Sequence, residues 1–456
     1  MARGFNFWAT VGAVMTALKL KDAYDDYQEL PQNEHGQRQT GPISLHSPID
    51  EESHGQGGNL ELDTTLPTAG RPKRKCHADC CVCCGLRCGI FWKAFGAVLA
   101  LFFIWQALRF IFWSGKPAST GLENMPEFST SLTCKDASYT FNPDTKTYSV
   151  PFNLSNASHH VYLNGDAFGT LIVTEGADDA TDIKYDFILK SNDESLLSRV
   201  SFKYPTQEQV DSGTEASKVT LETPVTTPTA DKSSQCMRFD IVLYVPPQLK
   251  NLTISSSSLT HLKFASRTGS RVNLDDLDVS MHSSHGQNLV LPTTSVRATN
   301  LRLRVSKGYL VGDVSILNST TIDTTCGDAI ANLHVYPSLS QDEAKFTTRT
   351  GDGRANFFFM HPTPSHSDGD DEHDHDDDHR QITSKHTASG TGDLYLKYEK
   401  SGFSGRVSLK AGSSTTKNMH AFDFHKSFTR GWVRDEDGKD RLNIKAGRNT
   451  WVGLYF

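Results

Sequence analysis

The sequence predicts a mainly β protein, with a β-solenoid or β-sandwich-like ectodomain that follows one transmembrane helix and a disordered N-terminal tail. Three observations predict this class. From about residue 138 onward, short runs of alternating apolar and polar residues lie between Gly, Pro, Asn and Asp breaks. Residues 89–113 are almost continuously apolar. Residues 19–75 have almost no aromatic residues or apolar periodicity.

Composition limits both the architecture and the function classes. The chain has 456 residues, which allows two or three modules, and only 37% of them are hydrophobic. That fraction is below the roughly 45–50% usual for globular domains, so a single large core is not expected. The net charge is -7 and no long basic stripe is present. Because nucleic-acid binding needs a basic surface, we exclude nucleic acid as a partner.

Residues 1–75 are predicted to be a disordered cytosolic tail, because the polar residues 19–75 cannot bury enough surface to offset their chain entropy. Within it, Tyr27-Gln-Glu-Leu30 has the form of a tyrosine-based sorting signal, on which a trafficking role would rest. Residues 5–18 have the length of a signal-peptide core. Their alternatives are a short interfacial helix and a wrongly assigned start of the coding sequence.

Residues 76–88 form a Cys-rich juxtamembrane segment. Six of the nine cysteines lie here: Cys76, Cys80, Cys81, Cys83, Cys84 and Cys88. Cytosolic cysteines beside Lys and Arg at a membrane are typical sites of S-palmitoylation, so we expect these six to be lipidated. A zinc site that includes His77 is the alternative, although adjacent Cys pairs lack the usual CxxC spacing.

Residues 89–113 are predicted to cross the membrane, since about 20 apolar residues at about 1.5 Å each cover the roughly 30 Å hydrocarbon layer. Lys and Arg gather before the span, which favours a cytosolic N-terminus. The lipid bilayer is therefore a predicted partner, and the protein a single-pass type II membrane protein. Its C-terminal domain would lie outside the cell or in the lumen, at the plasma membrane or a secretory-pathway membrane, beyond a stalk at 114–137.

Four sequons agree with this orientation, because all of them follow the span. They predict N-glycosylation at Asn153, Asn156, Asn251 and Asn318. The ectodomain also carries three cysteines. We expect a disulfide between Cys134 and Cys236, and we expect Cys326 to be a buried free thiol.

The ectodomain is expected in two parts, 138–246 and 247–456, of which the first is sandwich-like and the second a β-solenoid. TTCGDAIANL (324–333) and TRTGDGRANF (348–357) align without gaps, and Gly-Asp recurs at 312–313 and 392–393. A period of about two dozen residues is typical of solenoid coils. Gly would tolerate positive φ at the corners, and Asp would bond local amides. A two-sheet sandwich is the alternative.

Alternation predicts which repeat residues face inward, and these are Ile330, Leu333 and Val335. The solenoid is interrupted at 365–380, where four histidines lie among many aspartates. Imidazole and carboxylate together bind Zn²⁺, Cu²⁺ or Ni²⁺. The alternative, which we favour, is a disordered and solvated insert with no defined metal site and only weak affinity for divalent cations.

The segment VPPQLKNLTISSSS (Val245 to Ser258), the TxxGDxxAN repeats and a closing strand pair resemble the putative-adhesin β-solenoid domain family. Its fungal members share a polar tail, a Cys-rich segment, one span and a β domain. The resemblance covers Cys236 to Phe456 well and Cys134 to Met237 loosely. It implies an adhesive role and brings no catalytic residues.

The motifs of common enzyme classes are absent from the sequence: GxSxG, HExxH, a P-loop, GxGxxG and a complete EF-hand loop. We therefore predict no catalytic residue, cofactor or resident metal. The expected function is to present a glycosylated surface that contacts a cell-wall glycan, another protein or further copies of this chain. The alternative is a membrane-tethered carbohydrate-active β-helix enzyme, which would need a groove with convergent charged residues.

Overall fold

The computed structural model describes residues 82–83, 86–87, 95–107, 120–134, 136–214, 216–225, 235–265, 271–283, 286–338, 342–361, 380–425 and 428–456. The chain divides into two compact units, Met1–Ala118 and Ser119–Phe456. In the first unit, residues 95–107 are helical, and β1 (Val82–Cys83) pairs antiparallel with β2 (Leu86–Arg87). Of the helices in the described ranges, none is long and apolar enough to cross a membrane.

Several sequence predictions fall outside the described residues. These are the tail at 1–75 with its sorting motif and its apolar segment 5–18, the residues of the span on either side of 95–107, and the insert except for its last residue. Five of the six cysteines predicted to be lipidated also lie outside, and the sixth, Cys83, lies in β1.

The second unit is mainly β and contains two large sheets, as the class prediction expected. Sheet I runs in the order β24 (Ser413–Lys417), β28 (Trp451–Tyr455), β22 (Leu394–Lys397), β20 (Ala355–Phe359), β18 (Ile330–Pro337), β16 (Tyr309–Ile316), β14 (Leu289–Leu291), β12 (Thr260–Phe264), β6 (Phe168–Glu175), β10 (Met237–Val245), β7 (Ile183–Ser191) and β3 (Tyr139–Thr140), and β4 (Thr147–Val150) also pairs with β7.

Sheet II runs in the order β25 (His420–His425), β26 (Phe428–Val433), β23 (Gly405–Lys410), β27 (Asp440–Ala446), β21 (Ile382–Ala388), β19 (Ala344–Thr350), β17 (Ser319–Thr324), β15 (Val296–Val305), β13 (Val272–Met281), β11 (Asn251–Ser256), β5 (Ser158–Asn164), β9 (Lys218–Glu222) and β8 (Ser201–Lys203). Two short helices, α3 (Glu194–Leu197) and α4 (Gln207–Asp211), complete the unit within its described residues.

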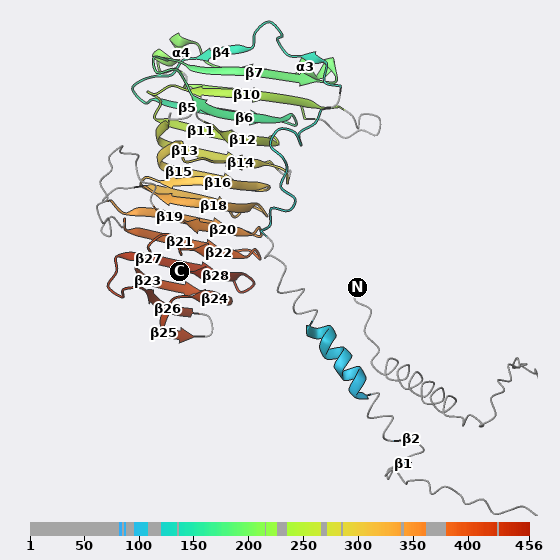
Figure 1. The fold of residues 1–456 in the computed structure, drawn as a ribbon. Coiled ribbons are helices and arrows are strands. Elements are labelled where there is room, and N and C mark those ends of the chain that lie inside the picture. The colour runs from blue at the N-terminus through green and yellow to red at the C-terminus, as the bar shows by residue number, and fades with distance from the viewer. Residues whose placement is uncertain are drawn as a thin grey trace, which may run out of the picture. The chain divides into compact units, whose positions relative to one another are not determined.

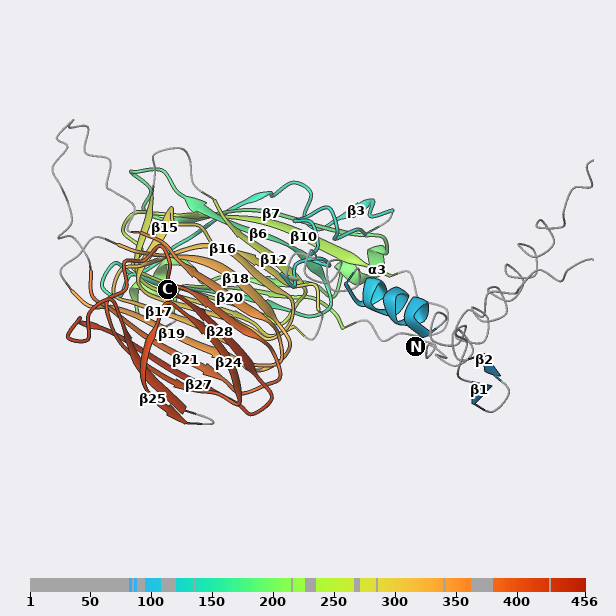
Figure 2. The ribbon, with the colours of Figure 1, turned by 60° about the horizontal axis from the view of Figure 1, so that its bottom comes forward.

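The chain winds through both sheets in turn. From β10 to β24 each successive strand changes sheet, and β11 to β22 pair in parallel with the strand two positions away, apart from the inserted last coil. Figure 1 shows the resulting stack, and in Figure 2 strands β15, β17, β19 and β21 succeed one another in one sheet and β16, β18 and β20 in the other. Neither sheet closes on itself, because each has two edge strands.

Strands β3 to β10 belong to these same two sheets. The boundary expected near residue 246 therefore does not divide the sheets, and the β-rich part 138–246 is continuous with the rest of the unit. The reason is that parallel pairing of β6 with β12 and of β5 with β11 carries both sheets across the expected boundary without a break. One continuous core fills the space between the sheets, from Tyr148 to Leu454.

Both ends of the stack are interleaved. The last coil of the chain, β27 and β28, lies between β21 and β23 in sheet II and between β22 and β24 in sheet I. At the other end, β5 lies between β9 and β11, and β6 between β10 and β12. The buried carboxylate of Asp440 joins the inserted coil to both neighbours, because its oxygens accept hydrogen bonds from Ile382 N at 2.7 Å and Ser404 N at 2.6 Å.

Inward residues stack in register from coil to coil. One such row in sheet I is Leu310, Ala331, Ala355, Leu394 and Val452, all of them buried. Leu333 and Val335 face the core as expected. Ile330 does not face the core. The odd-numbered residues of β18 are buried, and alternation along the strand places the even-numbered ones, including Ile330, on the outer face.

The repeated glycines serve a different purpose from the one expected. Of Gly312, Gly327, Gly351 and Gly392, only Gly312 has positive φ, at 149°. At Gly392 an added Cβ would lie 2.1 Å from the carbonyl oxygen of Gly353 in the preceding coil. Glycine is required there because the backbones of successive coils approach closely. The Asp352 carboxylate likewise bonds the next coil, at Thr391 N, at 2.9 Å.

Residues 120–134 form a strap along the outer face of sheet I, although the sequence predicted a stalk. Asn356 Nδ2 on β20 donates to Thr120 O at 3.1 Å, and Ser129 N donates to His261 Nδ1 on β12 at 3.2 Å. The strap covers an outward row that includes buried His261, Leu289 and Tyr309. This partly apolar row gives the segment a surface to pack on, which a free stalk would lack.

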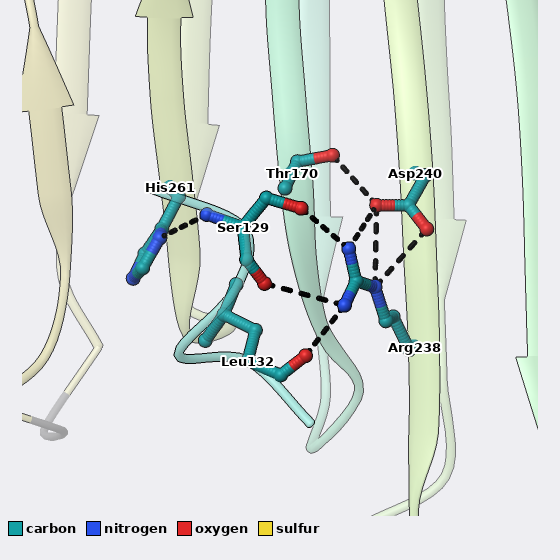
Figure 3. A network of polar contacts seen from close by, with 6 residues as sticks. All are labelled: Ser129, Leu132, Thr170, Arg238, Asp240 and His261. Carbon is teal, nitrogen blue, oxygen red and sulfur yellow. Dashed lines mark hydrogen bonds and ion pairs between the residues drawn. The ribbon is translucent and has the colours of Figure 1, made fainter. Parts of the chain in front are cut away.

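Arg238 on β10 holds the far end of the strap (Figure 3). Its guanidinium donates to Leu132 O at 2.5 Å and to Ser129 Oγ at 2.7 Å, and pairs with Asp240 at 2.9 Å. Asp240 also accepts from Thr170 Oγ1 at 2.8 Å. Burial lowers the pKa of His261 to about 4, which keeps its Nδ1 unprotonated as an acceptor for the strap.

The ectodomain cysteines are arranged largely as expected. Cys134 and Cys236 form a disulfide that joins the end of the strap to the residue before β10. Cys326 is a free thiol, but it is exposed, which corrects the expectation of burial. It lies in the turn after β17, where the strand alternation that would have directed it inward has ended.

Arg380, the last residue of the His/Asp insert, is buried and anchors the return of the chain to the stack. Its guanidinium donates to the carbonyl oxygens of Asp342, Ile316 and Leu317 at 2.6, 2.7 and 2.5 Å. It therefore ties three successive corners together.

Candidate binding groove on sheet II

A groove of about 580 Å³ opens on the outer face of sheet II near the C-terminal end of the stack. Four successive strands of the sheet form its floor: β21, β27, β23 and β26. Its lining residues are Thr383, Ser384, Lys385, Arg406, Val407, Ser408, Phe422, Arg430, Gly431, Glu436, Arg441, Leu442 and Asn443.

Each of the four strands contributes one cation to the groove: Lys385, Arg441, Arg406 and Arg430. Each of these residues is exposed and lies between buried neighbours, as strand alternation requires. Arg441 and Arg406 are direct partners in the parallel pairing of β27 with β23. Two like charges therefore lie side by side, an arrangement that destabilises a sheet unless an anion offsets it.

The loop before β27 positions two of these cations. Arg441 Nη1 donates to Gly438 O at 2.6 Å and to Asp440 O at 2.7 Å. Arg406 Nε donates to Glu436 O at 3.3 Å, and its Nη2 lies 3.7 Å from the exposed carboxylate of Asp437. Exposed ion pairs of this kind contribute little, at most about 1 kcal/mol, so they leave the Arg406 guanidinium available.

Cations outnumber carboxylates in the lining, where Glu436 is the only acid. Asp437 beside Arg406 and Asp423, which lies opposite Arg430 in the pairing of β25 with β26, bring the carboxylates in or beside the groove to three, against four cations. Farther along the same face of the sheet, Arg302 and Arg304 on β15 share the carboxylate of Asp278, at 3.7 and 2.7 Å. The groove is thus a local positive region on a chain whose net charge is -7.

An aromatic wall bounds the groove. Phe422 is 58% exposed, and its ring stacks on Trp432 with centroids 5.6 Å apart. His420 also stacks on Trp432, at 5.7 Å. The register of β25 against β26 shifts between Ala421 and Asp423, which is the position of Phe422. Such bulges redirect side chains, and this one presents a large apolar ring beside the cations.

Sequence reasoning missed this groove, although a signal was present. RVSLK (406–410), RGWVR (430–434) and RLNIK (441–445) each repeat a cation with strand alternation. No single run is long enough to be a basic stripe. The pairing of β23 with both β26 and β27 gathers them into one patch, and this pairing is not sequential along the chain.

The predicted N-glycosylation residues lie elsewhere. Asn156, Asn251 and Asn318 lie at or just before the first residues of β5, β11 and β17 in sheet II. The structure brings two of them together, because Asn251 Nδ2 donates to Asn156 O at 3.1 Å. Asn153 Oδ1 accepts from Ser155 N at 2.7 Å in the loop before β5. None of the four lines the groove, and their glycosylation stays a prediction.

A buried Ser-His-Tyr chain resembles catalytic geometry but is structural. Ser217 Oγ donates to Pro151 O at 2.7 Å and therefore accepts from His159 Nδ1, at 2.7 Å. His159 Nε2 then accepts from Tyr185 OH at 2.5 Å. His159 is fully buried and burial lowers its pKa to about 3. Ser217 is buried and its hydroxyl proton is donated to a carbonyl oxygen and not to His159. It therefore cannot act as a nucleophile on a substrate from solvent.

Metal binding was the alternative for the Cys-rich segment and the His/Asp insert. Among the described residues, no group of three or more His, Cys, Asp and Glu side chains is arranged to hold a metal ion. His77 and the insert histidines lie outside those residues, so the structure assigns no ligand set to either segment.

No protein-family model matches the chain, and no curated protein matches it. Among solved structures, a putative cell adhesion protein from Clostridium sporogenes is 9% identical, with a TM-score of 0.19, over 68% of this chain and 98% of its own. A putative adhesin from Bacteroides fragilis is 15% identical, with a TM-score of 0.26, over 70% of this chain and 96% of its own. Similarity at this level carries no argument about function.

Proposed function

We propose that the chain is a non-catalytic, single-pass type II membrane protein that presents an adhesin-like β-solenoid for contact with a cell wall, another protein or further copies of itself. The observation that carries the binding role is the groove on sheet II, where four exposed cations and an exposed aromatic ring line one depression. Such a set of side chains suits the recognition of a partner.

The same lining argues against the enzyme alternative. Glycosidases use two carboxyl groups that flank the scissile bond, about 5 to 9.5 Å apart. Glu436 is the only carboxylate among the residues that line the groove. A binding role needs no pair of catalytic carboxylates, so it accounts for this surface better than a carbohydrate-active enzyme does.

The membrane part of the proposal rests on the apolar segment 89–113 and on the Lys and Arg residues that precede it. In this arrangement the six juxtamembrane cysteines are acylated in the cytosol, and the four sequon asparagines carry glycans on the opposite side. The β unit then lies outside the cell or in the lumen of the secretory pathway.

Topology is tested with the full chain tagged at its N-terminus and expressed in eukaryotic cells. We expect endoglycosidase to lower the apparent mass of the chain. We also expect protease added outside intact cells to leave the N-terminal tag uncut, because the tag faces the cytosol. The matched control replaces all four sequon asparagines with Gln, after which endoglycosidase should have no effect. An unglycosylated β unit on the cytosolic side would overturn the proposal.

The binding role is tested on cells that display the full chain. They are expected to retain more fluorescently labelled cell-wall fragments, or to aggregate more, than cells without it. Retention and aggregation equal to those of the control cells would contradict an adhesive role.

A further inference from the structure

We infer that the groove on sheet II binds an acidic polysaccharide, whose carboxylate or sulfate groups pair with Lys385, Arg441, Arg406 and Arg430. This inference rests on the proposed binding function and narrows it to one class of ligand. Three features of the groove support it: the excess of cations over carboxylates, the spacing of the cations and the aromatic wall.

The first feature is the excess of cations over carboxylates in the groove. Lys385 and Arg430 lie in one outward row of the sheet, Lys385–Asn443–Ser408–Arg430, and Arg441 and Arg406 lie in the next, Thr383–Arg441–Arg406–Trp432. The cations of β15 pair with a carboxylate on the neighbouring strand, whereas Arg441 faces another arginine. A bound anion would remove this repulsion, so the groove favours ligands with negative groups.

The spacing of the cations suits a chain molecule with repeated charges. Adjacent strands lie about 4.8 Å apart, so four consecutive strands spread their cations over about 14 Å. A single phosphate or carboxylate can engage only one or two of them. An extended polymer with an anionic group on successive units can engage all four, and Asn443 and Ser408 between them supply hydrogen-bonding groups.

The aromatic wall points to sugar. Rings of Phe and Trp have negative faces that attract the partly positive C–H bonds on one side of a pyranose. Phe422, stacked on Trp432, presents such a face beside Arg430. Single-stranded nucleic acid also combines charge with stacking, but it is bound by several aromatic side chains on which successive bases stack, and Phe422 is the one aromatic residue among those that line the groove. Nucleic acid is therefore treated as an outcome of the test.

The test measures binding of the purified full chain, in neutral detergent, to polygalacturonate, dextran sulfate, uncharged dextran and oligo-dT by biolayer interferometry. We expect binding to one or both acidic polysaccharides that weakens at least tenfold between 50 and 500 mM NaCl. Uncharged dextran should not bind measurably.

The variant is Lys385→Gln with Arg430→Gln, because both side chains are exposed and neither makes a backbone hydrogen bond among the contacts described above. We expect its affinity for the acidic polysaccharide to fall at least tenfold, with an unchanged melting temperature. Lys345→Gln is the matched control. It lies on the same face, in the row of Thr383, but already pairs with Glu343 at 3.7 Å, and its replacement should change affinity less than twofold.

Phe422→Ala should weaken binding about threefold or more, since it removes the exposed ring and leaves the cations in place. Equal binding to uncharged dextran, tighter binding to oligo-dT, or full affinity in the double variant would overturn the inference while leaving an adhesive role intact. If no acidic polysaccharide binds but displaying cells still retain cell-wall fragments, the inference alone fails. If both fail, the proposed function fails with it.

Discussion

Two buried histidines each join the two sheets, one toward either end of the stack. His159 on β5 bonds Tyr185 on β7, and His386 on β21 lies 3.1 Å from Tyr398 OH, just after β22. His386 also bonds Thr348 Oγ1 at 2.8 Å. Desolvation by burial lowers the pKa of each histidine to about 3, so both are neutral in the folded protein at any physiological pH.

This predicts acid sensitivity. Unfolding returns each imidazole to a pKa near 6.5, so between pH 6.5 and about 3 the unfolded chain binds more protons than the folded one. Stability is fully present above pH 6.5 and falls as the pH drops, by at most about 1.4 kcal/mol per pH unit for each histidine. Urea unfolding at pH 7, 5.5 and 4.5 measures this slope.

His386→Gln isolates one contribution. The variant is expected to be less stable than the natural protein at pH 7, because the hydrogen bonds at this site are disturbed, but to lose less stability on acidification. A pH slope identical to that of the natural protein would show that His386 does not titrate on unfolding.

At the scale of elements, the coils are held at a spacing that only glycine permits at several corners. Gly392 stacks on Gly353, and Gly353 in turn stacks on Ala329, where an added Cβ would lie 2.0 Å from the carbonyl oxygen. These atoms belong to backbone and cannot turn away as a side chain would. The corners therefore determine how closely successive strands pair.

Gly392→Ala is accordingly expected to destabilise the protein by about 2 to 4 kcal/mol, because the methyl group forces β21 and β22 away from the preceding coil. Gly286→Ala is the matched control, since no atom lies within 4 Å of its added Cβ and its φ is not positive. It should change stability by less than about 0.5 kcal/mol. Equal melting temperatures for the two variants would contradict this account of the corners.

At the scale of the whole molecule, interleaving makes the ends of the stack depend on distant parts of the chain. In an ordinary repeat array each coil contacts only its sequence neighbours, and the last coil lies outermost. Here the last coil, β27 and β28, lies inside β23 to β26. The groove floor needs this insertion, because β27 supplies Arg441 between Lys385 and Arg406.

Deletion of residues 440–456 should therefore also unfold strands that remain in the chain. Strands β23 and β24 would lose their parallel partners, β27 and β28, and the Asp440 carboxylate that bonds Ser404 N would be lost with them. Limited trypsin digestion followed by mass spectrometry should show cleavage throughout 400–434 in the truncated chain and protection in the intact one. A protected fragment that contains β23 and β26 would show that this end of the stack folds without the inserted coil.

Sequence periodicity alone was sufficient to predict the class of fold and many of the buried core residues. Alternation directs Leu333 and Val335 inward whatever their partners are, and the near-identical TxxGDxxAN units imply equivalent places in successive coils. The pairing of Cys134 with Cys236 also followed from the few cysteines of the ectodomain. These properties are local or compositional, and they do not depend on which strands become neighbours.

Only the tertiary structure decided the features that depend on strand order. The insertion of β27 between β21 and β23 and the strap over His261 both arise from contacts between residues far apart in the chain. The groove belongs with them. Its cations are spread over four separate runs of sequence, and they become one binding surface only because non-sequential strands pair side by side.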